Sequence, residues 1–127
     1  MSRVLSKAGL LALAALLWAA AGLTASARAG DADHGEALYQ GCQDCHSLDN
    51  NDVGPKHRGV YGRKAGSIAD YNYSEALKNA AIVWDEANLD HWLTDPQGFL
   101  PGAKMFYHLD DAKDRADVIE FLKTRAR

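Results

Sequence analysis

The run Cys42-Gln43-Asp44-Cys45-His46 constrains this chain more than any other part of its sequence. Cys42 and Cys45 are its only cysteines, and His46 follows the second one directly. Two thiols at this spacing add to the two vinyl groups of one haem, and the adjacent imidazole then reaches the iron from one side. The motif therefore predicts one covalently bound haem c, attached through Cys42 and Cys45, with His46 as an axial ligand of the iron.

Three other uses of the two cysteines compete with haem attachment: a structural disulfide, a thioredoxin-like dithiol and half of a zinc site. A redox-active dithiol normally lies between a strand and a helix, and no strand pattern precedes Cys42. A structural zinc ion would need further ligands, which a second cysteine pair usually supplies and this chain lacks. The pentapeptide favours haem over these alternatives.

Residues 1–29 are typical of a secretory signal peptide rather than of the folded domain. A short basic start is followed by an uncharged, Leu- and Ala-rich stretch at residues 8–27, and Ala27-Arg28-Ala29 offers a cleavage site between small residues. An uncleaved membrane anchor is the alternative, because the uncharged stretch approaches the ~20 residues of a spanning helix. We expect cleavage, a mature domain of residues 30–127 and a periplasmic location.

The charge of the expected mature domain excludes two classes of partner. Arg3, Lys7 and Arg28 are the only charged residues before position 30, so residues 30–127 keep 11 of the 14 Lys and Arg and all 17 Asp and Glu, a formal charge of −6. Nucleic acids and anionic membrane surfaces select clustered positive charge. We expect no nucleic-acid partner, and no lipid binding unless the leader is retained as an anchor.

Helix signals, with no alternating strand pattern, predict an all-α domain with long loops. Asp31 or Asp33, Ser74 and Asp85 are suitable N-caps, and Pro96 should end a helix near Thr94. Loops this long are unusual in a small domain unless they surround something. We expect helices at about 31–42, 74–79, 85–94 and 111–124, with loops at 47–72 and 97–109.

A second iron ligand follows by elimination. Once the leader is removed, Met105 is the only methionine, and it lies in the loop Pro101-Gly102-Ala103-Lys104-Met105. A thioether there would complete His/Met ligation, raise the reduction potential and close the iron to small molecules. Filling a gap in the core is the alternative role for a methionine. The remaining histidines are expected at the surface: His34, His57, His91 and His108.

Residues 30–127 resemble class I c-type cytochromes of the mitochondrial cytochrome c and bacterial cytochrome c2 type. The similarity goes beyond the haem motif, because further family positions follow in the same order along the chain. They are Gly54-Pro55, residues 59–66, Tyr73, Trp84, Pro96, residues 101–105 and residues 115–117. The resemblance implies a small cytochrome c fold, with four to five helices and long loops wrapped around one covalently bound haem.

The same resemblance implies roles for individual residues. His46 and Met105 would be the axial ligands, and the Pro55 carbonyl would accept a hydrogen bond from the His46 imidazole, fixing its tautomer. Arg63, Tyr73 and Trp84 would surround a buried haem propionate, consistent with the need of a buried hydroxyl or indole N–H for a partner. Gly35 and Tyr39 of the first helix would pack against Phe121 of the last.

Several positions depart from the family pattern. Leu77, Trp92 and Ala103 replace an asparagine, a tyrosine and a threonine that make polar contacts near the haem in many members. Gln97 and Gly98 replace lysines with which mitochondrial members dock on partners. These departures leave His/Met ligation as the prediction, but they limit what the resemblance implies about partners.

The predicted function is that of a periplasmic, single-haem electron carrier and not of an enzyme. Its partners would be redox proteins, with a reductase or dehydrogenase as donor and an oxidase as acceptor, and we expect a monomer. A haem peroxidase or gas-binding sensor is the alternative, but both need an open sixth coordination position, which Met105 would close. A haem-free thiol module is a third possibility, and it would lack the colour of a haem protein.

Overall fold

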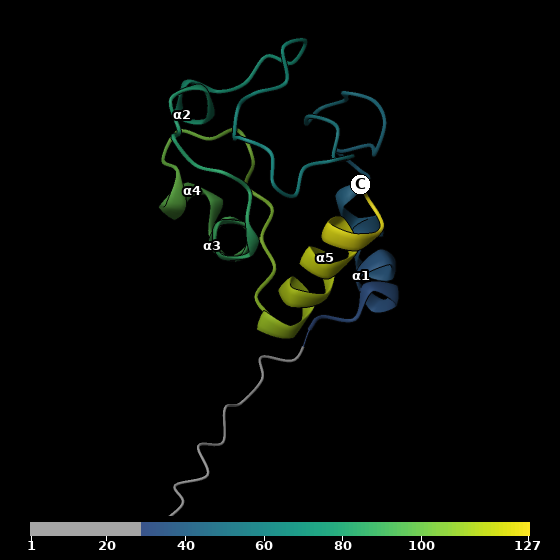
Figure 1. The fold of residues 1–127 in the computed structure, drawn as a ribbon. Coiled ribbons are helices and arrows are strands. Elements are labelled where there is room, and N and C mark those ends of the chain that lie inside the picture. Colours follow the sequence, from purple (N-terminus) through teal and green to yellow (C-terminus); the bar gives the residue numbers. More distant parts are fainter. Residues whose placement is uncertain (1–28) are drawn as a thin grey trace, which may run out of the picture.

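The computed structural model describes residues 29–127, and within this range the fold is all-α, as predicted (Figure 1). Its one β feature there is an isolated bridge between Lys64 and Val83. The predicted leader, residues 1–29, lies outside the described residues except for its last position. Among residues 29–127, no helix is long and apolar enough to cross a membrane. The helices are α1 (Ala32–Tyr39), continued by a 3₁₀ turn at Gln40–Cys42, α2 (Glu75–Lys78), α3 (Glu86–Thr94), α4 (Pro96–Phe99) and α5 (Ala112–Thr124).

Every α-helix begins at a side chain that accepts hydrogen bonds from the first free backbone N–H groups. Asp31 accepts from the amides of Asp33 and His34, and Ser74 accepts from the amide of Leu77. Such caps satisfy donors that have no partner inside the helix. Short helices can therefore start sharply between long loops. The complete set of N-caps is Asp31, Ser74, Asp85, Asp95 and Asp111.

The predicted loop at 97–109 is wrong at its start, because Pro96–Phe99 forms the short helix α4. Pro96 ends α3 as expected, but it then occupies the first turn of a new helix, where its missing N–H costs nothing. The Asp95 carboxylate accepts a 2.9 Å hydrogen bond from the Gly98 amide and caps the new turn. The chain therefore turns at Asp95 and coils once more before the loop begins.

Helices α1 and α5 lie side by side on one side of the molecule, and α2, α3 and α4 occupy the other (Figure 1). Gly35 allows the close approach of α1 to α5, because a Cβ at this position would overlap the backbone carbonyl of Asp117. The ring of Tyr39 then packs on Phe121, with centroids 5.0 Å apart. The contact that the resemblance implied for these residues is present, and α3 reaches α5 from the other side.

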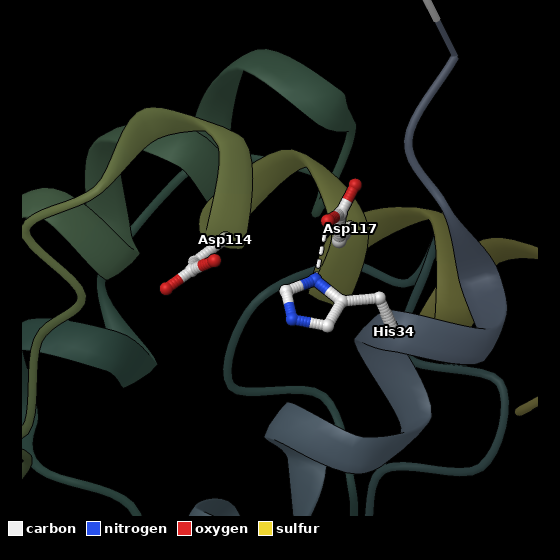
Figure 2. A group of neighbouring side chains, drawn as sticks. All are labelled: His34, Asp114 and Asp117. Atoms are coloured by element: carbon white, nitrogen blue, oxygen red, sulfur yellow. Dashed lines mark hydrogen bonds and ion pairs between the residues drawn. The ribbon is translucent and has the colours of Figure 1, made fainter.

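A buried carboxylate ties the two helices together. Asp117 on α5 is only 2% exposed; one oxygen accepts from the Asp31 amide at 2.7 Å, and the other contacts His34 Nδ1 at 2.7 Å and Lys113 Nζ at 2.5 Å. Figure 2 shows the His34 ring directed at this carboxylate, with Asp114 nearby on the same helix. Because Asp117 already has several donors, the group is an ion-pair and hydrogen-bond network that joins α1 to α5.

Candidate functional site

A cavity of about 500 Å³ lies between the α1–α5 pair and α3. Its walls are mostly apolar and include Tyr39, Val118 and Leu122 on one side and Leu89 and Trp92 on the other. This volume falls within the roughly 300–1,000 Å³ typical of small-molecule and cofactor sites. All eight residues predicted for the site line this one cavity: Cys42, Cys45, His46, Pro55, Arg63, Tyr73, Trp84 and Met105.

The His46 imidazole is oriented by the segment that follows the haem motif. The Gly54 amide donates to the Cys45 carbonyl at 2.7 Å, which brings residues 54–55 against the motif. His46 Nδ1 then donates to the Pro55 carbonyl at 2.8 Å, and a Cβ at Gly54 would collide with the His46 ring. Burial lowers the pKa of His46, so the ring is neutral at pH 7. With its proton on Nδ1, the ring has a free lone pair on Nε2, as a metal ligand needs.

His57 was expected at the surface, and this prediction is wrong. Its ring stacks on the His46 ring, with centroids 3.9 Å apart and planes 20° from parallel. The Tyr39 hydroxyl lies 2.9 Å from His57 Nδ1. Burial, then the proximity of His46 and Arg63, lowers the pKa of His57 well below its usual value, so this ring is neutral as well. Because burial raises the pKa of Tyr39, its phenol stays protonated, and the hydroxyl and His57 Nδ1 share one hydrogen bond.

The thiols of Cys42 and Cys45 are both free and both line the cavity. Burial raises the pKa of the Cys42 thiol to about 11. A redox-active dithiol instead lowers the pKa of its attacking thiol to roughly 3.5–7.5, so this environment is unlike a thioredoxin site. Neither cysteine belongs to a potential metal-binding group of His, Cys, Asp and Glu within residues 29–127, which also disfavours zinc.

Arg63, Tyr73 and Trp84 form a polar part of the cavity wall that would suit a propionate of a haem. Hydrogen bonds between residues 62–65 and 82–84, including the Trp84 amide to the Arg63 carbonyl at 2.9 Å, bring Arg63 and Trp84 together. The Arg63 guanidinium donates to the Lys56 carbonyl at 2.8 Å and to the Arg58 carbonyl at 3.2 Å. It therefore places a fixed cation at the cavity wall, beside the buried ring of Tyr73.

Met105 reaches the same cavity from the loop at residues 100–109, which we call the ligand loop. The Met105 side chain is half-buried against the core. The Gln97 side chain on α4 holds this loop, since its Nε2 donates to the carbonyls of Ala103 and Met105, each at 2.8 Å. Neither Gln97 nor His57 was expected to contribute to the site. Sequence carries no local signal for either contact, because both depend on loops folding back on a helix.

The cavity opens to solvent beside large apolar side chains. Phe106 and Val53 are 73% and 71% exposed, although both line the cavity, and Tyr107 lies near them. Asp44 and Lys104 are the charged side chains among the exposed residues of this mouth. Exposed apolar side chains beside a site mark a surface that another molecule can cover.

The residues present fit a covalently bound haem. Two free thiols from cysteines three positions apart, a neutral imidazole, a thioether and the half-buried guanidinium of Arg63 all line one mostly apolar cavity. Leu77 and Trp92, which replace polar family residues, line the cavity too, and Ala103 is buried beside it. These replacements make the walls more apolar without removing any of the predicted ligands.

Comparison with known proteins agrees with the site. The family model for cytochrome c matches residues 32–126. Cytochrome c2 of Rhodomicrobium vannielii is 44% identical over 116 residues, covering 88% of this chain and 90% of that protein. Cytochrome c of Euglena viridis is 43% identical over 99 residues, covering 75% of this chain and 97% of that protein.

A solved structure agrees as well. Cytochrome cH from Methylobacterium extorquens superposes with a TM-score of 0.73 at 46% identity, covering 76% of this chain and all of that one. The range matched by the family model, residues 32–126, covers nearly all of the mature domain expected from the sequence. The chain belongs to the cytochrome c family as a class I c-type cytochrome, and it carries the one covalently bound haem c of that family.

Proposed function

We propose that this protein is an exported one-electron carrier in which His46 and Met105 are the axial ligands of the haem iron. The observation that carries the proposal is the convergence of Cys42, Cys45, His46 and Met105 on one cavity. When bound, haem supplies the reversible one-electron couple of its iron. In this proposal the chain's own residues bind, orient and shield that group, and no substrate is transformed.

Each contact has a part in keeping the site unchanged between oxidation states. The Pro55 carbonyl fixes the proton of His46 on Nδ1, so Nε2 keeps facing a metal. The half-buried Arg63 cation at the cavity wall offers a partner for a haem propionate, which would otherwise be an unpaired buried charge. The apolar walls exclude water. A site that changes little on oxidation suits transfer of an electron without bond making or breaking.

The exposed mouth would be the place where electrons enter and leave. Phe106 and Val53 are exposed there, since residues 29–127 leave most of both side chains uncovered. A contact centred on two such side chains would be small and brief, as a shuttle requires. We propose redox proteins as partners, with a reductase or dehydrogenase as donor and an oxidase as acceptor, and a periplasmic location after removal of residues 1–29.

Replacing Met105 tests the ligand assignment. The Met105→Ala holoprotein should lose the methionine–iron signature of the ferric spectrum, and the reduced protein should bind carbon monoxide tightly, which the native protein should resist. Leu100→Ala is the matched control, because it shortens another half-buried apolar side chain of the ligand loop. An unchanged ferric spectrum in Met105→Ala would refute His/Met ligation. Tight carbon monoxide binding by the native protein would favour a gas sensor or peroxidase instead.

The mass of the protein purified from its native host tests whether the leader is cleaved and whether one haem is covalently bound. Cleavage after Ala29 together with one haem would be read directly as the mass of residues 30–127 plus that of haem. A mass that includes residues 1–29 would indicate a retained anchor and a membrane-attached carrier.

A further inference from the structure

The ligand loop has little hydrogen bonding of its own. Its start is a turn in which the Ala103 amide donates to the Leu100 carbonyl at 3.1 Å, and its end is fixed by the Leu109 amide, which donates to the Leu93 carbonyl at 2.8 Å. Between these points, within the part of the chain that the structure describes, the backbone of residues 104–108 takes part in one hydrogen bond. That bond comes from Gln97.

The side-chain amide of Gln97 has two N–H donors, and the loop offers two backbone carbonyl acceptors within their reach. Its two N–H groups meet the Ala103 and Met105 carbonyls, both at 2.8 Å. Both partners are acceptors, so only the NH₂ end of the side chain can serve. The two carbonyls flank Lys104, whose own Nζ donates to the Asn72 carbonyl at 2.9 Å. The Gln97 amide therefore joins the carbonyls on either side of Lys104, and one of these carbonyls belongs to Met105.

The position of Gln97 is set by the helix that sequence reasoning missed. The Asp95 cap and Pro96 coil the chain once, and this single turn directs Gln97 toward the loop. The side chain is half-buried, so the hydrogen bonds are partly shielded from water. Because α4 also contacts α3, the donor stands on a fixed part of the fold.

We infer that Gln97 is a positioning residue that latches the ligand loop and so keeps Met105 on the iron. The inference rests on the proposed His/Met ligation and adds the residue that sets how firmly the methionine is held. Displacement of Met105 breaks the hydrogen bond to its carbonyl, and displacement of residues 103–105 together breaks both bonds. A residue without N–H donors at position 97 would leave the backbone of residues 104–108 without a hydrogen bond to residues 29–127, and only the Lys104 side chain would still tie this stretch to Asn72.

Imidazole binding to the ferric holoprotein measures the latch directly. Imidazole can bind the iron only in the fraction of molecules in which Met105 has left, so its apparent affinity rises in proportion to that fraction. Gln97→Leu, which has similar size and no donor, should raise the imidazole affinity and the rate of loop opening by roughly tenfold or more, as loss of two hydrogen bonds implies. Gln97→Glu keeps the shape but cannot donate when ionised, and should act in the same direction.

Gln40→Leu is the matched control, since Gln40 is exposed and its side chain makes no hydrogen bond among residues 29–127. It should leave imidazole affinity at the native value. If both Gln97 variants fold with bound haem and bind imidazole within twofold of the native protein, while Met105→Ala binds it far more tightly, the latch is overturned and His/Met ligation stands. If native protein and Met105→Ala bind imidazole equally, the ligation fails and the latch with it.

Discussion

Two regions of this cytochrome hold the haem site in opposite ways. The α1–α5 junction is dense: Gly35 brings the helices into contact, Tyr39 stacks on Phe121, and the Asp117 carboxylate is buried among several donors. The ligand loop, residues 100–109, has an exposed surface and is joined to the rest of the chain by few hydrogen bonds.

The difference shows how one small domain can hold the attachment motif firmly and still leave the loop of Met105 lightly held. Helix α1 of this junction continues through the 3₁₀ turn directly into the motif, so the tight packing of α1 restrains Cys42, Cys45 and His46. The ligand loop supplies one of the two proposed iron ligands, Met105, and its neighbours Lys104, Phe106 and Tyr107 line the exposed mouth. Because the attachment side is firmly packed and the loop that carries the proposed ligand Met105 is lightly held, we expect the lowest free energy of opening at this loop.

The largest expected difference is between the opening free energies of α5 and of the ligand loop, measured by native-state hydrogen exchange. The amides of Val118 and Phe121 in α5 should exchange only through global unfolding, whereas the Ala103 amide should exchange through opening of the ligand loop. We expect a gap of about 5 kcal/mol between the two opening free energies, from the range that local and global openings span. Equal values at both places would mean that loop and junction open together, and the comparison would fail.

Gly35→Ala should disrupt the packing of α1 against α5. Helix propensity alone predicts that this change stabilises α1 by about 1 kcal/mol. The structure predicts the reverse sign, because the new Cβ would overlap the Asp117 carbonyl, and we expect a loss of about 3 kcal/mol. Guanidinium unfolding of the ferric protein measures it. Ala37→Ser adds one atom on the exposed face of the same helix and should change stability by less than about 0.5 kcal/mol.

Asp117→Asn should remove the charged tie between the helices. Burial opposes ionisation of Asp117, but hydrogen bonds from Lys113, the Asp31 amide and His34 outweigh it and hold its pKa at about 2. Since this folded value is below the ordinary 3.8, the group stabilises the fold above about pH 4, and the stabilisation is lost as pH falls toward 2.

The Asn variant should therefore lose about 2 kcal/mol near pH 7 and show a flatter stability profile between pH 4 and 2. Unfolding curves at several pH values measure both. Asp110→Asn, at a side chain that is 93% exposed, is the control and should leave the neutral-pH stability nearly unchanged. A native profile in Asp117→Asn would show that the junction does not depend on this carboxylate.

Tyr39→Phe should give the smallest effect, because it removes one hydroxyl and keeps the ring on Phe121. The lost hydrogen bond to His57 Nδ1 should cost about 1 kcal/mol of stability without changing the methionine–iron signature. Thermal unfolding measures the loss of stability, and the ferric spectrum reports the methionine–iron signature. Tyr61→Phe, whose hydroxyl makes no hydrogen bond among residues 29–127, should be neutral. A lost methionine signature would mean that Tyr39 acts on the ligand loop as well.

Prediction from the sequence succeeded where the signal was local. The caps Asp31, Ser74 and Asp85 marked helix starts, because capping depends on residues within one turn of each other. Prediction was wrong at Pro96, since a proline that ends one helix is equally suited to begin the next. The sequence of the last helix also could not reveal that Asp117 is buried, because two of its donors, the Asp31 amide and His34, come from the start of α1.

The sequence by itself determined the covalent chemistry: Cys42, Cys45 and His46 are neighbours along the chain, and their spacing alone indicates a haem c. It also determined the all-α class and singled out Met105, the one methionine of the expected mature domain. Only the tertiary structure decided that His57 stacks on His46 and that Gln97 reaches the ligand loop. Those contacts join segments that no short-range pattern relates, so they exist only once the chain has folded around the site.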